Sequence, residues 1–291
     1  MEVQNSLPLL LDCLNRWKTV PTERQFIQEY AEPMQSLVGD FFDDYHSVLQ
    51  DLSDANEWTS FRAEAMKLDE SAELARARKN IGDVEQLFGF KLGGKLTLMG
   101  AFGAMDGFAR FDCGDHHVFL GVDEGHLQGR YLDVLTVHEL THVARESRPS
   151  VWEGFGLDPR MTRPEFVENL PVIEHLFGEG FSCLISEILV PGETPWTYGY
   201  VTEEGFNRIR SNSASADIGI RRELKSGNPD YGRLYSPGHY HPQLPTFAHY
   251  VWGWKWTERL LRDLNQSDVR KLVNRSSQEF FEDALQFELR L

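Results

Sequence analysis

The chain has 291 residues, which is enough for one large domain or two modest ones, and it can bury a core without disulfides or a structural metal. A hydrophobic content of 41% and an aromatic content of 12% indicate a globular protein and exclude a disordered chain. The formal net charge is −16, and the acidic residues are spread along the sequence. Nucleic-acid backbones and anionic membrane surfaces would be repelled, so we expect neither as a partner.

No stretch approaches the roughly 20 consecutive apolar residues of a membrane-spanning helix, and no basic segment precedes the short apolar run at residues 9–11. We therefore expect a cytoplasmic protein. Cys13, Cys113 and Cys183 are widely spaced, odd in number and without a CxxC pair. This pattern predicts buried reduced thiols rather than disulfides or a cysteine zinc site.

From residue 1 to about residue 90, apolar residues recur every three or four positions, which predicts an N-terminal helical region. Between residues 95 and 122 the pattern changes to short β-like runs separated by glycines, at 96–99, 108–111 and 118–122. These runs predict a small mixed or antiparallel sheet. We expect two regions, a helical one at residues 1–90 and a functional domain at residues 91–291.

The helical period returns at residues 131–146, and Arg148-Pro149 marks its end. Further along we expect, in order, a loop at 150–163, an apolar helix at 172–190, a helix at 203–225, a loop at 226–245 and an aromatic-rich helix at 246–264. The last helix is predicted to begin with a capping box of Ser276 and Glu279. The whole pattern predicts an α+β fold, mostly helical, with its small sheet beside the helix at 131–146.

The helix predicted at 131–146 contains the motif His138-Glu139-Leu140-Thr141-His142. Helix positions four apart lie about 40° from each other on one face, so the imidazoles of His138 and His142 can bind a single metal ion. Glu139 lies about 100° around the helix, beside the ion and within reach of a metal-bound water. Because the surrounding residues are apolar, these polar groups are costly to bury unless something satisfies them. The motif therefore predicts a zinc site with Glu139 as the general base.

A hydrolytic zinc site needs a third protein ligand and an open position for water. A metzincin would have glycine at position 145 and histidine at position 148, but these positions are Arg145 and Arg148, so that class is excluded. A glutamate on a second helix is the alternative. The candidates are Glu153, Glu165, Glu168, Glu174, Glu179 and Glu187.

Glu179 is the strongest candidate, because its helix is apolar and no lysine or arginine lies between residues 164 and 191 to neutralise it. A carboxylate buried there requires a cation. Gly178 and Gly180 flank it, and each weakens a helix by roughly 1 kcal/mol relative to alanine. That cost makes sense if another backbone or a ligand approaches closely. Glu153 also stands in a Glu-Gly-Phe triplet, but in a predicted loop, which fixes a ligand less well.

HExxH on one helix with a glutamate ligand on the next resembles the gluzincin class of metallopeptidases. The stretch Gly178-Glu179-Gly180-Phe181-Ser182 is similar to Asn-Glu-Gly-Phe-Ala of the zinc aminopeptidases, in which the glutamate is the third zinc ligand. The chain also resembles a family of uncharacterised proteins described as predicted Zn-dependent proteases, through residues 137–143, 179–180, 195–196 and 250–253. The resemblance covers roughly residues 96–261. It implies a zincin-like fold and hydrolysis of peptide or protein substrates.

The same resemblance implies two further roles. In the aminopeptidases a tyrosine on a later helix donates a hydrogen bond to the oxyanion, which implies this role for Tyr250. The alternatives lie in the proline-rich loop: His239, Tyr240 and His241.

Residues 103–107, Gly-Ala-Met-Asp-Gly, are similar to the Gly-Ala-Met-Glu-Asn stretch of the aminopeptidase cleft, which implies that Gly103 and Asp106 bind substrate. Asp106 replaces the glutamate and the asparagine is missing, which argues against exopeptidase activity. A glycine-rich strand could still bind an extended peptide by backbone pairing, and a plain turn between strands is the alternative.

The function expected from these features is a zinc-dependent peptidase in which Glu139 deprotonates a zinc-activated water. Two alternatives remain open, because the site does not encode the substrate. One is a zinc hydrolase acting on a non-peptide amide or ester. The other is a regulatory or chaperone-like binding protein that keeps zinc without turnover.

Overall fold

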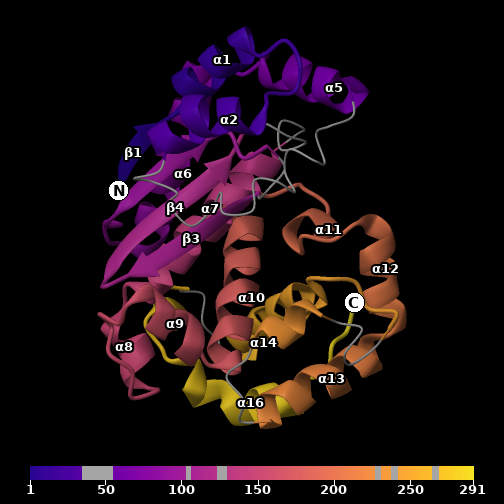
Figure 1. Cartoon of the computed structure of the whole chain (residues 1–291). Coiled ribbons are helices and arrows are strands. Elements are labelled where there is room, and N and C mark those ends of the chain that lie inside the picture. The colour runs from indigo at the N-terminus through magenta and orange to yellow at the C-terminus, as the bar shows by residue number, and fades with distance from the viewer. Residues whose placement is uncertain (35–54, 103–105, 123–129, 227–230, 237–241, 264–268) are drawn as a thin grey trace.

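The computed structural model describes residues 1–34, 55–102, 106–122, 130–226, 231–236, 242–263 and 269–291. It has the predicted α+β fold, mostly helical with one small sheet. Helices α1, α2 and α5 lie at one end of the molecule, the sheet lies beneath them, and the helices from α10 onward fill the opposite half (Figure 1).

The N-terminal region begins with a short strand and continues as helices. Its elements are β1 (Glu2–Asn5), α1 (Leu7–Arg16), α2 (Glu23–Phe26), the π-helix η1 (Ile27–Ala31), α5 (Ala55–Ala65) and α6 (Glu70–Phe88). Helix α6 starts where the carboxylate of Asp69 accepts hydrogen bonds from two first-turn amides. It ends at Gly89, whose φ of 80° requires the left-handed conformation that glycine adopts readily. The expectation of an entirely helical N-terminal region is therefore wrong at β1.

The sheet is mixed and has the strand order β1-β2-β4-β3. All three predicted strands are present, as β2 (Lys95–Met99), β3 (Gly107–Asp112) and β4 (Asp115–Gly121). β1 and β4 both pair in parallel with β2, whereas β3 pairs antiparallel with β4, with Ala109 opposite Val118. Within the described part of the chain, β3 is thus an edge strand.

The helices after the sheet are α7 (Tyr131–Glu146), α8 (Pro149–Glu153), α9 (Arg163–Asn169), α10 (Val172–Leu189), α11 (Pro195–Tyr198), α12 (Glu203–Ser211), α13 (Ser213–Lys225), η3 (Tyr231–Tyr235), α14 (Ala248–Asp263), α15 (Arg270–Val273), η5 (Ser277–Phe280) and α16 (Phe281–Gln286). Three predictions fail here. The loop expected at 150–163 contains most of α8, and the loop expected at 226–245 contains η3. The helix expected at 203–225 breaks at Asn212.

The predicted capping box at residues 276–279 is also wrong. The Ser276 hydroxyl does cap a helix, but that helix is the 3-10 helix η5, and it accepts its hydrogen bond from the amide of Gln278. Glu279 pairs instead with Arg275, at 2.7 Å. The tighter 3-10 turn removes the geometry that a capping box requires.

One hydrophobic core joins the two regions expected from the sequence. It contains Leu10 and Phe26 from the first 90 residues together with Val137, Leu176 and Trp256 from later helices. Helix α7 lies in the middle of this core, in contact with the sheet, α6 and α10. Residues on both sides of the expected boundary near residue 90 therefore pack in the same core, and other elements surround α7.

None of the described helices combines the length and apolarity needed to span a bilayer. All three cysteines are free; Cys13 and Cys183 are buried as expected, but Cys113 is exposed, so the expectation is wrong for that residue.

Candidate metal centre

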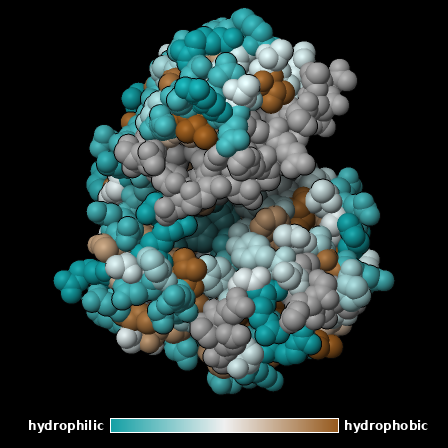
Figure 2. Space-filling model, viewed as in Figure 1, coloured by the Kyte–Doolittle hydropathy of each residue, from teal (hydrophilic) through white to brown (hydrophobic). Residues whose placement is uncertain are grey.

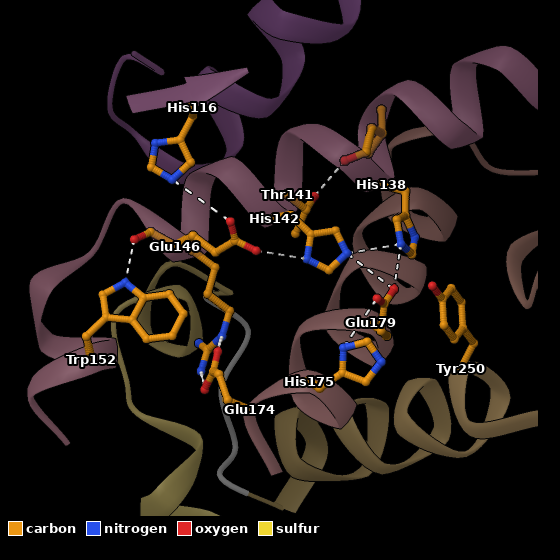
Figure 3. A network of polar contacts seen from close by, with 12 residues as sticks. His116, His138, Thr141, His142, Glu146, Trp152, Glu174, His175, Glu179 and Tyr250 are labelled. Atoms are coloured by element: carbon orange, nitrogen blue, oxygen red, sulfur yellow. Dashed lines mark hydrogen bonds and ion pairs between the residues drawn. The ribbon is translucent and has the colours of Figure 1, made fainter. Parts of the chain in front are cut away.

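The structure brings His138, His142 and Glu179 together. The two histidines lie one helical turn apart on α7, and Glu179 faces them from α10, as Figure 3 shows. His138 Nε2 lies 3.0 Å and His142 Nε2 lies 3.3 Å from Glu179 Oε2, and the two imidazole nitrogens are 3.2 Å apart. Among the residues that the structure describes, this is the group of metal-ligating side chains with the right proximity for one ion.

The triangle of these three atoms fits the donor set of a zinc ion. Bonds of about 2.0–2.1 Å at tetrahedral angles place ligand atoms about 3.3 Å apart. The three separations of 3.0, 3.2 and 3.3 Å come close to this value. Two imidazoles and one carboxylate are also a ligand set of catalytic zinc sites that leave a fourth position for water.

The electrostatics of the cluster also favour a cation. His138 and Glu179 are 2% and 6% exposed, so both have lost most of their hydration. Burial alone would raise the pKa of Glu179, but the neighbouring imidazoles of His142 and His138 hold it well below its usual range. Burial alone would lower the pKa of His142, but the carboxylates of Glu179 and Glu146 raise it well above its usual range. Positive charge is thus stabilised at this point of the core.

Glu139 lies beside the triangle without belonging to it. Its side chain is 7% exposed and lines the same cavity as His142 and Glu179. Burial, with the negative charges of Glu179 and Glu146, raises the pKa of Glu139 to about 8. The backbone of Ala109 on β3 hydrogen-bonds its carboxylate. The carboxylate therefore lies next to the edge strand, in the lining of the cavity that His142 and Glu179 share.

The other five glutamates considered from the sequence have different roles. The carboxylate of Glu174 is bound by the Arg145 guanidinium, with contacts of 2.5 and 2.7 Å. Glu187 accepts a hydrogen bond from the Trp254 indole, and Glu165 forms the capping box of α9 with Thr162. The remaining two, Glu153 and Glu168, are exposed.

Different contacts surround the two glycines that flank Glu179. A Cβ on Gly180 would lie 2.0 Å from the carbonyl carbon of Gly253, so α10 and α14 pack backbone against backbone there. A Cβ on Gly178 would lie 3.5 Å from His142 Cε1. Close approach of another backbone thus accounts for Gly180, while Gly178 faces the imidazole of the cluster.

Tyr250 lies beside the cluster, as Figure 3 shows. Its ring stacks on His138, with centroids 5.7 Å apart and an interplanar angle of 9°. Its hydroxyl lies 3.1 Å from that of Tyr235, and both tyrosines line the cavity. The sequence gives no signal for Tyr235, because η3 reaches the site only through tertiary packing.

Asp106, which the resemblance also implied, does not join this cluster. Asp106 is exposed, accepts a 2.6 Å hydrogen bond from the Tyr131 hydroxyl and does not line the cavity. Gly103 lies outside the described residues, as do His239, Tyr240 and His241.

Glu146 and His175 are neighbours of the cluster that the sequence analysis missed. Glu146 Oε1 lies 3.6 Å from His142 Nδ1, and Glu146 Oε2 lies 4.0 Å from His116 Nε2 on β4. On α10, His175 Nδ1 lies 3.7 Å from Glu179 Oε1. Each stands four residues from a predicted ligand on the same helix, and this spacing is the signal that could have identified them. A carboxylate on the outer nitrogen of a ligating histidine commonly fixes its tautomer and orientation.

The cluster opens onto a cavity of about 430 Å³. Figure 2 shows the molecule hollowed between its upper and lower halves. Edge strand β3 forms one wall through Gly107, Phe108 and Ala109, and the opposite wall includes residues of α10, η3 and α14. A cavity of this volume is within the range of small-molecule and peptide-binding sites.

Comparisons with family models, with curated proteins and with solved structures found no match for this chain.

Proposed function

We propose that this chain is a zinc-dependent peptidase whose metal is held by His138, His142 and Glu179. The observation that carries the proposal is the triangle of three buried ligand atoms, 3.0 to 3.3 Å apart, in the wall of a cavity that also presents Glu139. A bound cation would compensate the cost of burying two imidazoles and a carboxylate at this point.

A zinc ion in this position would lower the pKa of a bound water to about 7 and polarise a carbonyl group. The positive charge of such an ion would also lower the raised pKa of Glu139 and favour its carboxylate form. Glu139 then acts as the general base: its carboxylate accepts the proton of the attacking water and later delivers it to the leaving amine. The low exposure of Glu139 keeps bulk water from competing for that proton. Tyr250 and Tyr235 line the same cavity, and we propose their hydroxyls as donors to an oxyanion.

Edge strand β3 favours a peptide as the substrate. It forms a wall of the cavity, and the backbone of an edge strand can pair with an extended chain. Ala109 on this strand touches Glu139, so a peptide bound along β3 would pass directly beside the general base. This arrangement supports hydrolysis of a peptide bond more directly than hydrolysis of a small amide or ester.

Metal analysis of the purified protein tests the ligand set. We expect one zinc per chain, lost in Glu179→Ala but retained in Glu153→Ala, a matched control in which an exposed glutamate is removed. Zinc retained by Glu179→Ala would contradict the proposed ligands.

Peptide hydrolysis by Glu139→Gln tests the mechanism. This variant should keep its zinc and lose roughly 10²- to 10⁴-fold in kcat, the contribution expected of a general base. Undiminished turnover would exclude Glu139 as the base. If small amides or esters are hydrolysed and peptides are not, the substrate assignment is wrong while the metal site stands.

A further inference from the structure

One end of the cavity is lined by large apolar side chains that take no part in the proposed chemistry. We call this end the aromatic chamber: Phe111 of β3, Trp152 of α8, Phe166 of α9, and Leu170, which directly follows α9. The Phe166 ring lies 5.3 Å from that of Phe111 and 5.5 Å from that of Trp152, measured between centroids. Val167, 44% exposed, adds an apolar side chain at the rim. Three elements thus meet to form an apolar wall.

Two polar pairs border the aromatic chamber. The Trp152 indole donates a 2.7 Å hydrogen bond to the carbonyl of Glu146, as Figure 3 shows. The Arg145 guanidinium and the Glu174 carboxylate bind each other through two contacts. A charged or polar side chain entering the chamber would lose its hydration and gain no partner from these groups, whereas an apolar side chain gains by leaving water.

The aromatic chamber lies within a short distance of the proposed reaction centre along two elements. On β3, Ala109 touches Glu139, and Phe111 follows two residues later on the same face, about 7 Å along the strand. On α7, Glu146 anchors Trp152 one helical turn, about 6 Å, beyond His142. An extended peptide advances about 3.4 Å per residue. The chamber is therefore within reach of a side chain one or two residues from the bond attacked beside Glu139.

We propose that the aromatic chamber selects substrates, by binding a large apolar side chain, aromatic above all, one or two residues from the scissile bond. This inference rests on the proposed peptidase function. Arg163, another cavity-lining residue, excludes basic side chains: its guanidinium lies 5.8 Å from the Phe108 ring centroid and makes no ion pair with any described residue. The chamber thus assigns a substrate class to the site.

Binding to the Glu139→Gln variant with zinc added tests the selection apart from turnover. The probes are fluorescein-labelled octapeptides of alanine and glycine that carry one phenylalanine, leucine, aspartate or lysine at each position in turn, and the readout is fluorescence anisotropy. We expect at least tenfold tighter binding of the best phenylalanine peptide than of its alanine, aspartate and lysine counterparts. Val167→Asp in the same background should abolish this preference.

Ile218→Asp is the matched control, because Ile218 is an exposed apolar residue of another helix, α13, that does not line the cavity. It should leave the preference unchanged. Equal binding of all peptides, the lack of any binding, or a preference for aspartate or lysine would overturn the inference. A phenylalanine preference without cleavage by the wild-type protein would support the chamber and contradict the peptidase proposal. Cleavage by the wild-type protein without that preference would support the peptidase proposal and contradict the chamber.

Discussion

The contact between Gly180 on α10 and Gly253 on α14 gives the sharpest prediction about stability. A Cβ on Gly180 would lie 2.0 Å from Gly253 C, whereas ordinary contact begins at 3.4 Å, so the helices would have to separate locally by about 1.4 Å. No rotamer change relieves this overlap, because the atoms it meets belong to the backbone of α14. Gly180→Ala is therefore expected to push the two helices apart.

The magnitude follows from two opposing effects. Overpacking of a core costs roughly 1–3 kcal/mol, and a clash with backbone belongs at the upper end. Replacing glycine by alanine inside a helix returns about 1 kcal/mol. We therefore expect Gly180→Ala to lower the free energy of unfolding by about 2 kcal/mol and Tm by about 5 °C.

Gly178→Ala is the control on the same helix, two residues earlier. Its Cβ would meet His142 Cε1 at 3.5 Å and Nδ1 at 3.6 Å, which are ordinary contacts. This variant should keep its stability or gain up to about 1 kcal/mol. Urea unfolding followed by circular dichroism, with a chelator present so that metal binding does not contribute, measures both variants. A Gly180→Ala protein as stable as the wild type would refute the packing argument.

Three further predictions concern the surroundings of the site. Glu146→Gln should weaken zinc binding 10- to 100-fold in a chelator competition, because the carboxylate 3.6 Å from His142 Nδ1 is lost. Unchanged zinc affinity would show that Glu146 does not orient His142. Tyr250→Phe should lower kcat for peptides roughly 10²- to 10³-fold with zinc retained, and unaltered kcat would leave Tyr235 as the donor to the oxyanion. Burial and two nearby cations lower the pKa of His117 from 6.5 to about 4, so the unfolded chain binds a proton in this range that the folded chain does not. The free energy of unfolding should therefore fall by about 1 kcal/mol as the pH falls from 6.5 to 4. In His117→Gln the urea concentration at the unfolding midpoint should depend less on pH over that range. An equally steep fall in the variant would assign the loss of stability to other groups.

Helices α7 and α10 were predictable almost to the residue, because proline flanks both and a strong apolar pattern fills them. Helical spacing predicted that His138 and His142 point in one direction, and the lack of a local counter-charge on an apolar helix identified Glu179 as their partner. The three strands after residue 95 were also predictable, because β-like runs and glycines alternate there.

The remaining features depend on contacts between distant parts of the chain. β1 has only four residues and is stabilised by parallel pairing with β2, more than 90 positions away, which no local pattern encodes. Glu174 is a plausible ligand by sequence, and only the packing of α7 against α10 shows that Arg145 neutralises it. Tyr235 reaches Tyr250 through tertiary structure alone.

The buried pair of Arg145 and Glu174 has a consequence for shortened versions of the chain. Arg145 and Glu174 bind each other, and each also bonds to the C-terminal segment. Arg145 donates a hydrogen bond to the carbonyl of Leu272, and Glu174 accepts one from the amide of Ser277. The segment around residues 272–277 supplies no predicted ligand, yet it completes the hydrogen bonding of two charges located between α7 and α10. A truncation that ends before Leu272 would leave both charges with open bonding positions about one helical turn from the proposed metal ligands. A shortened chain that keeps this part of the core intact must therefore retain the C-terminal segment.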